Sequence, residues 1–366
     1  MDRKSLLLLL CVLVLFVLGL SMVFNTTSAE VLDRALAKST HHAVLKQILY
    51  AILALILAAG VWFVGFDQIL RLSGFFLTCV TVLLVLVFIP GIGMCLNGAH
   101  RWLGIGGYSF QPSELAKYLI PLHYIFAITS RKEPLLLKDF LKLLAKLSIP
   151  MGLILIEPDN GTVAIILSSL LVLFLLTKIR WLYWGLPLLV ILVVGVAAAS
   201  QMPHVSNRIQ IYLHPEMDLQ GKGHQPHQAK IAAGSGGAFG RGLGESLQKL
   251  NYLPEARSDY IAAIFAEEFG FIGICGLVVL YTLIGYLGFS IAAETDNLPA
   301  FYTVAIFTFL ICFQAFLNLG VVSGLLPSKG TNLPFFSHGS SSLLANFIVI
   351  CMILNIANKK NNYVIT

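Results

Sequence analysis

The sequence predicts an all-α integral membrane protein that crosses the bilayer ten times. Of its 366 residues, 57% are hydrophobic and only 11% are charged, whereas an ordinary soluble domain has about 25% charged residues. Apolar runs recur along the chain at about the 20 residues that a helix needs to span a bilayer. Ten such helices take about 200 residues and leave little room for a soluble domain. We therefore expect a single membrane domain over residues 1–366.

The ten apolar runs are taken in order as the ten helices. The first follows Asp2-Arg3-Lys4 and exceeds the roughly 7–15 apolar residues of a signal-peptide core, so we expect it to be retained. The runs lie at about 5–24, 45–66, 71–91, 113–130, 141–157, 161–177, 181–200, 260–290, 300–326 and 340–357.

The link between the fifth and sixth runs is short for two separate spans. It consists of Glu157-Pro158-Asp159-Asn160-Gly161. Non-helical backbone at membrane depth is tolerated only where protein or a water-filled cavity surrounds it. The link therefore predicts a polar cavity.

The long loop at about 201–258 is expected on the outer face. Its glycines at 234–237 and 240–244 are typical of turns and close backbone approach. With the amino terminus inside, the inner segments hold twelve Lys and Arg residues and the short outer loops five, so both termini are expected in the cytoplasm.

The cysteines argue against a metal site and a disulfide, and the basic residues argue against a nucleic-acid partner. The six cysteines lack the spacing of a metal site, so we expect no metal and no disulfide. The net charge of +6 comes from scattered residues, which argues against a nucleic-acid partner.

Ionisable residues near membrane helices are functional candidates because their insertion is costly. Glu114 and Lys117 are three residues apart, so a structural ion pair is expected, with a substrate contact as the alternative. Asp159 either caps the next helix or lines the cavity. Asp259, with Glu267 and Glu268 two turns deeper, is a candidate general base, because a partly desolvated carboxylate can have a raised pKa. Helix capping is the alternative there.

Four blocks of the sequence carry a shared pattern. They lie at 101–103 with 110–117, at 157–162, at 228–260 with 267–270, and at 326–330 with 333–343. These blocks resemble the SEDS family (shape, elongation, division and sporulation), whose members are the FtsW and RodA type peptidoglycan glycosyltransferases. With the expected helices, they cover nearly the whole chain.

The resemblance implies an enzyme of the bacterial cytoplasmic membrane that polymerises lipid II at the outer face, for division or cell-shape wall synthesis. In the family, an aspartate after a Leu-Pro-Glu-Ala block is the essential base, and it corresponds to Asp259. It would deprotonate the acceptor sugar's 4-hydroxyl as undecaprenyl pyrophosphate leaves. Diphosphates need positive charge and donors, which Arg101, Lys117 and Lys329 offer. The other expected substrate-binding residues are Asp159, Glu255, Arg257, Ser337 and His338.

The chain departs from the usual family pattern at two of these positions. Arg257-Ser258 replaces His-Thr before the aspartate, and His338 stands where relatives have tyrosine. Residues 242–250 and 326–330 look closer to the division-associated FtsW branch. The family implies a class B penicillin-binding protein transpeptidase as partner, together with other division or elongation membrane proteins. No cofactor is implied, although a divalent cation would be compatible with diphosphates.

A lipid II flippase or transporter is the alternative function. The broken hairpin at 157–161 supports it. A flippase needs polar access from both faces, however, whereas Asp159, Asp259 and the long loop are all expected toward the outside. This asymmetry favours a reaction at one membrane surface over transport across the membrane. The presence of Asp259 likewise favours an enzyme over a catalytically silent scaffold.

Overall fold

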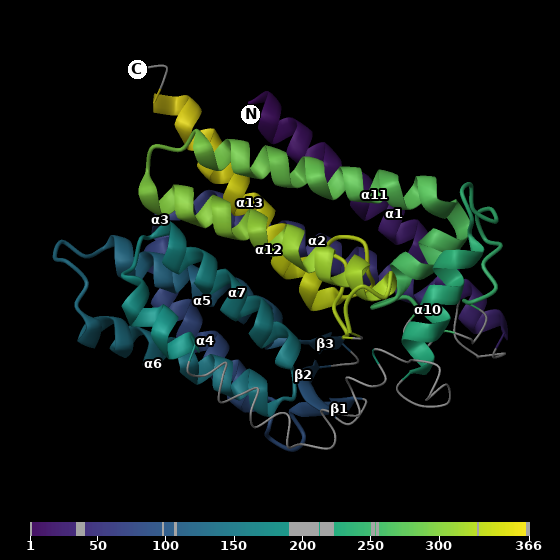
Figure 1. Ribbon diagram of the computed structural model, residues 1–366, viewed down its shortest axis with the longest axis horizontal. Coiled ribbons are helices and arrows are strands. Elements are labelled where there is room, and N and C mark those ends of the chain that lie inside the picture. The colour runs from purple at the N-terminus through teal and green to yellow at the C-terminus, as the bar shows by residue number, and fades with distance from the viewer. Residues whose placement is uncertain are drawn as a thin grey trace.

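The computed structural model describes residues 2–33, 41–96, 99–105, 108–189, 212, 223–249, 253, 256–327 and 329–363. Most of these residues form a bundle of helices (Figure 1). The helices are α1 (Arg3–Asp33), α2 (His42–Val64), α3 (Phe66–Arg71), α4 (Ser73–Leu86), α5 (Pro112–Thr129), α6 (Leu137–Ile156), α7 (Asn160–Leu176), α10 (His224–Ser235), α11 (Ile261–Ala293), α12 (Leu298–Val322) and α13 (Ser340–Tyr363).

The mostly helical membrane fold is confirmed, but the count of ten spans is not. Within the described ranges, five helices are long and apolar enough to cross a membrane, and α4 and α7 are apolar but shorter. The run expected at 71–91 corresponds to α4, which ends at Leu86, and the run at 181–200 is described only to residue 189. The five helices that are long and apolar enough to cross a membrane are Arg3–Ala29, Ala43–Val64, Ile261–Ala293, Leu298–Val322 and Ser340–Lys359.

A small β-sheet departs from the all-α expectation. It comprises β1 (Gly93–Leu96), β2 (Ala99–Ile105) and β3 (Tyr108–Phe110), which pair antiparallel in that order. The pairs Asn97-Gly98 and Gly106-Gly107 separate these short runs in the sequence. Two-residue spacers of this kind are typical of hairpins, a signal that the search for apolar runs passed over.

The long outer loop also contains a helix that was not predicted. Residues 224–235 form α10, which packs mainly against α11. Its sequence has no apolar stripe, and of its side chains Ala229 and Ala232 are the buried ones. Good helix formers such as Gln228, Ala229 and Lys230 lie in its middle, so neither periodicity nor propensity predicts the whole helix.

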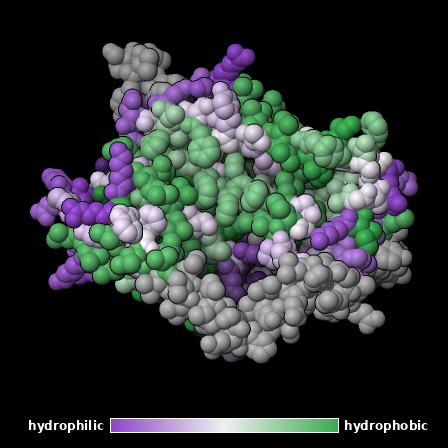
Figure 2. Space-filling view, in the orientation of Figure 1, coloured by the Kyte–Doolittle hydropathy of each residue, from purple (hydrophilic) through white to green (hydrophobic). Residues whose placement is uncertain are grey.

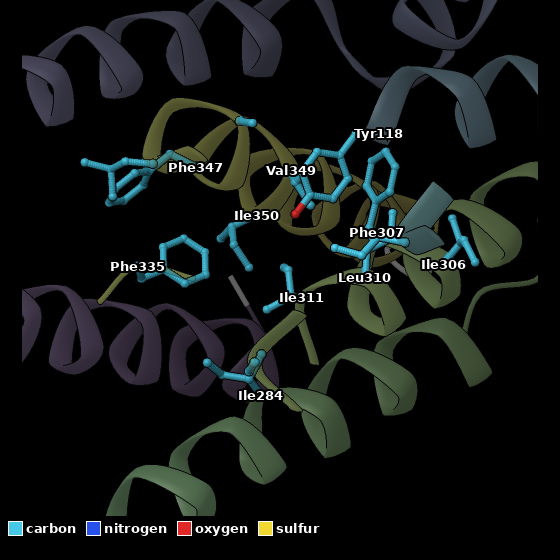
Figure 3. Packing of buried hydrophobic residues seen from close by; sticks show 14 of the residues in the cluster. Tyr118, Ile284, Ile306, Phe307, Leu310, Ile311, Phe335, Phe347, Val349 and Ile350 are labelled. Carbon is cyan, nitrogen blue, oxygen red and sulfur yellow. The ribbon is translucent and has the colours of Figure 1, made fainter. Parts of the chain in front are cut away.

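The interior packs around α12 (Figure 3). Phe307 of α12 meets Tyr118 of α5 edge-on, with ring centroids 5.4 Å apart. Phe335, in the loop between α12 and α13, meets Phe347 of α13 at 5.7 Å. Aromatic pairs in this geometry add to the free energy gained by burial. The loop that enters the candidate site is therefore anchored in the core.

The outer surface suits a bilayer. Apolar side chains cover the middle of the bundle, and hydrophilic ones gather toward its ends (Figure 2). On α2, Leu45 and Ile56 are 62% and 63% exposed, as expected of lipid-facing positions. The start of α1 and the end of α13 lie at the same end of the bundle (Figure 1).

Candidate functional site

The candidate site lies where the link between α6 and α7 meets the segment before α11 and the loop before α13. Residues 329 and 330 of that loop approach both of the aspartates that the sequence singles out.

Asp159 caps α7 and also contacts a second element. Its Oδ1 accepts a hydrogen bond from the Thr162 amide at 3.1 Å, and its Oδ2 accepts from Thr162 Oγ1 at 2.7 Å. Gln111, just before α5, donates to Oδ2 at 3.3 Å. Asp159 is only 7% exposed. Asp159 therefore caps α7 and also bonds to the residue that precedes α5.

Arg101 of β2 holds the link between α6 and α7. Its Nε donates to the Glu157 carbonyl at 2.8 Å and its Nη2 to the Pro158 carbonyl at 2.7 Å. These contacts turn the guanidinium toward backbone, so the structure gives Arg101 a supporting role beside the one expected toward phosphate.

The Glu157 carboxyl group is fully buried, and neither of its oxygens has a hydrogen-bond partner in the described parts of the chain. Burial raises its pKa to about 8, and the Asp159 charge adds to this, while Arg101 opposes it. Glu157, which lies in the link and outside both helices, is therefore mainly protonated at neutral pH.

Lys329 lies against Gly161 at the start of α7. A β-carbon on Gly161 would be 2.9 Å from Lys329 Nζ and 3.2 Å from Asp159 Oδ1. Burial lowers the pKa of Lys329, and the Asp159 charge opposes this. Over the described ranges, the ammonium has no hydrogen bond or ion pair, so it is available to an anionic ligand.

Gly330, the next residue, touches the Asp259 side chain. A β-carbon on Gly330 would lie 2.6 Å from Asp259 Oδ2. Asp259 itself precedes α11, whose N-cap is Tyr260. The dipeptide Lys329-Gly330 thus joins the two aspartates, which are 100 positions apart in the sequence.

Ser337 and His338 hold the segment that carries Asp259. Ser337 Oγ donates to the Ser258 carbonyl at 2.6 Å, and the His338 amide donates to the Arg257 carbonyl at 3.0 Å. The His338 ring lies with Nδ1 2.6 Å from Gln47 Oε1, and Gln47 Nε2 donates to the Ser337 carbonyl.

The His338 imidazole is neutral at pH 7. Burial lowers its pKa to about 4, and the charges of Arg257 and Lys46 contribute. Because Gln47 Oε1 is an acceptor, the single ring proton belongs on Nδ1.

Glu114 and Lys117 form an ion pair in the bundle interior. Lys117 Nζ lies 2.7 Å from Glu114 Oε2 and also donates to Gln314 Oε1 at 2.7 Å. The Lys117 side chain is 1% exposed. Its cation is therefore engaged by protein groups and is set apart from the surface of the site.

Glu267 and Glu268 bind the glycine-rich segment 236–249 rather than extending the site. Glu267 accepts from Ser246 Oγ and Arg241 Nη1, and Glu268 accepts from Lys249 Nζ at 2.9 Å. A β-carbon on Gly240 would lie 2.1 Å from the Glu268 carbonyl oxygen. The close backbone approach that the glycines predict is therefore present, and it fixes the first turns of α11.

Glu255 lies outside the described residues. Among the described residues, no three His, Cys, Asp or Glu side chains are grouped to hold a metal ion, and the cysteines are free.

The sequence prediction did not include the amides Gln47, Gln111, Gln314 and Asn318, which carry no charge. Gln47, Gln314 and Asn318 lie within apolar helices, where polar side chains commonly bond across helices.

Comparisons with known proteins agree with one another. The profile of the cell cycle protein family that includes FtsW, RodA and SpoVE matches residues 5–362. The probable peptidoglycan glycosyltransferase FtsW of Legionella pneumophila is 35% identical over 350 residues, which are 93% of this chain and 88% of that protein.

Solved structures are also similar over nearly the full length. A chain from a peptidoglycan synthase complex that coordinates polymerization and crosslinking aligns with a TM-score of 0.76 and 26% identity, covering 96% of this chain and 97% of that one. The rod shape determining protein RodA of Thermus thermophilus aligns with a TM-score of 0.68 and 26% identity, covering 96% of each chain.

Proposed function

Because the chain belongs to the SEDS family of cell cycle proteins, with FtsW, RodA and SpoVE, we propose that it is an FtsW-type peptidoglycan glycosyltransferase that polymerises lipid II. The observation that carries the proposal is the junction at Lys329-Gly330. It brings a cation without a protein partner in the described residues beside Asp159, and a backbone surface beside the Asp259 carboxylate.

In the proposed reaction, Asp259 is the general base. Its carboxylate takes the proton of the acceptor sugar's 4-hydroxyl as that oxygen attacks the anomeric carbon of the growing strand. The bond from the anomeric carbon to the diphosphate breaks, and undecaprenyl pyrophosphate leaves with the electron pair. A single displacement inverts the anomeric carbon and needs no covalent enzyme intermediate.

Lys329 supplies positive charge to the leaving diphosphate. An ammonium in a partly desolvated site interacts strongly with charge that develops in the transition state. Asp159, which already accepts three hydrogen bonds, lines the same pocket. Arg257 and His338 lie on the acceptor side, since both adjoin the segment of Asp259.

The cellular setting follows from the same assignment. The enzyme works at the outer face of the bacterial cytoplasmic membrane, with both termini inside, as the Lys and Arg distribution supports. A class B penicillin-binding protein is its partner. The similarity to a chain of a peptidoglycan synthase complex supports this pairing, and the similarity to FtsW supports a role in division.

The decisive test is glycan polymerisation from labelled lipid II by purified protein, alone and with its cognate transpeptidase. Wild type is expected to form polymer, and Asp259→Ala, shown to be folded by size-exclusion chromatography, is expected to form none. Asp296→Ala is the matched control, because Asp296 is an exposed aspartate beyond the end of α11.

A vesicle assay for lipid II translocation runs in parallel. Translocation without polymer under any condition would replace the glycosyltransferase with the flippase. Polymer formed equally by Asp259→Ala would leave the reaction class standing and remove Asp259 as the base.

A further inference from the structure

In the backbone segment that carries Asp259, three consecutive carbonyl groups each accept a hydrogen bond. The carbonyls of residues 257–259 accept from the His338 amide at 3.0 Å, from Ser337 Oγ at 2.6 Å and from Asn318 Nδ2 at 2.8 Å, in that order. This segment is a turn that precedes the first helical residue of α11. The three donors tie its carbonyl groups to α12 and to the loop before α13.

Asn318 is the donor that acts on Asp259 itself. Its Nδ2 donates both of its hydrogens, one to the Asp259 carbonyl and one to the Thr331 carbonyl at 2.6 Å. The residue is 1% exposed and lies on α12. Thr331 follows Gly330, which touches the Asp259 carboxylate. The Asn318 amide therefore sets the distance between the backbone of Asp259 and the loop before α13.

A second amide side chain on α12, that of Gln314, extends these contacts into the bundle. Gln314, one turn earlier on α12, donates to the Asn332 carbonyl at 2.9 Å and accepts from Lys117 Nζ at 2.7 Å. Lys117 is in turn paired with Glu114 on α5. Side chains four positions apart on one helix thus hold two successive carbonyls of the loop, and α5 braces them.

We propose that Asn318 is a positioning residue for the general base, acting through the backbone of Asp259. The inference rests on the proposed function. A carboxylate attached to a non-helical segment keeps its angle to the acceptor hydroxyl only while that segment is fixed. Misplacement of a reacting group by about 1 Å can cost about 100-fold in rate.

The test compares Asn318→Ala and Asn318→Asp in the lipid II polymerisation assay. Asn318→Ala removes both donors and is expected to lower kcat by about 10- to 100-fold while KM for lipid II stays within about twofold. A buried aspartic acid at this position is protonated, because burial disfavours its charged form, and its hydroxyl donates one of the two hydrogen bonds. Asn318→Asp is therefore expected to keep more activity than Asn318→Ala.

The pH profile separates positioning from general loss of structure. As pH rises, Asn318→Asp loses its proton and its donor, so its rate relative to wild type is expected to fall, whereas the ratio for Asn318→Ala stays flat. Asn355→Ala is the matched control, because the Asn355 amide also bridges two backbone groups, Phe66 N and Trp62 O, but in the part of α13 remote from the loop. It is expected to lower thermal stability and leave kcat unchanged.

The outcomes distinguish the two claims. Polymer formation that is abolished in Asp259→Ala but equal to wild type in both Asn318 variants would overturn the positioning role alone. Parallel pH profiles for the two Asn318 variants would also overturn it. Absence of polymer from wild type would overturn the proposed function, and this inference with it.

Discussion

The Asp259 carboxylate lies against the α-carbon of Gly330, so closely that a β-carbon there would be 2.6 Å from Oδ2 and 3.8 Å from Oδ1. Contacts under 3.0 Å are essentially never seen for real β-carbons. A side chain at this position would therefore have to displace the Asp259 carboxylate, whereas the backbone angles of Gly330 would accept one, since it has no positive φ. The loop before α13 is shaped to leave room for this carboxylate.

Gly330→Ala is accordingly expected to displace the Asp259 side chain while leaving the helices in place. We expect a fall in kcat of about 100-fold and a small change in thermal stability. Gly276→Ala in α11 is the control, because a β-carbon there meets nothing within 4 Å. A Gly330→Ala enzyme with wild-type kcat would contradict the proposed position of the base.

Gly161→Ala tests the place of Lys329. The new β-carbon would stand 2.1 Å from Lys329 Cε, so the flexible lysine must move away from the pocket. We expect kcat to fall about tenfold, and further in Lys329→Met, because a hydrogen bond to a charged group contributes about 1.5–3 kcal/mol and this one acts on charge that develops in the transition state. Gly152→Ala in α6, with nothing within 4 Å, is the control. An unchanged kcat in Lys329→Met would exclude the lysine from stabilising the leaving diphosphate.

The buried Glu157 predicts a pH dependence of stability. Its pKa is about 8 in the folded chain and 4.5 in its ordinary state, so between these values the folded protein holds a proton that the unfolded chain releases. The free energy of unfolding is therefore expected to fall as pH rises through this range, by at most about 1.4 kcal/mol per pH unit.

Glu157→Gln keeps the shape of the neutral side chain and should remove this slope. Thermal unfolding in detergent from pH 5 to pH 9 measures it, and the variant is expected to be more stable than wild type at pH 9. Glu133→Gln, at an exposed position between α5 and α6, is the control. A wild-type slope in Glu157→Gln would show that another group titrates.

Much of this arrangement could be predicted from single residues, and some could not. Apolar length predicted the helical membrane fold, because that signal is local. The cavity expected at 157–161 stays a prediction. The contact between Gly330 and Asp259 could not be predicted, since it joins positions that no periodicity relates.

The contacts of Glu267 and Glu268 could not be predicted for the same reason. Their place near Asp259 in the sequence suggested one acidic cluster, but a helix directs neighbouring side chains to different faces. In the structure they bind the segment 236–249. The amide of Asn318 was passed over because a lone asparagine in an apolar helix carries no charge, and its two carbonyl partners come from elsewhere in the chain.

Glu114 and Lys117 form a buried ion pair. Removing one partner of a buried ion pair costs about 3–5 kcal/mol, because the other charge is left without compensation. Lys117→Met and Glu114→Gln are each expected to lower the free energy of unfolding by an amount of this order. The double variant leaves no charge unpaired, so its loss should be well below the sum of the two single losses. Thermal unfolding of the four proteins gives this coupling directly, and strict additivity would mean that the pair contributes nothing. Because Lys117 also holds Gln314, and Gln314 holds the Asn332 carbonyl, Lys117→Met should lower kcat more than Glu114→Gln does.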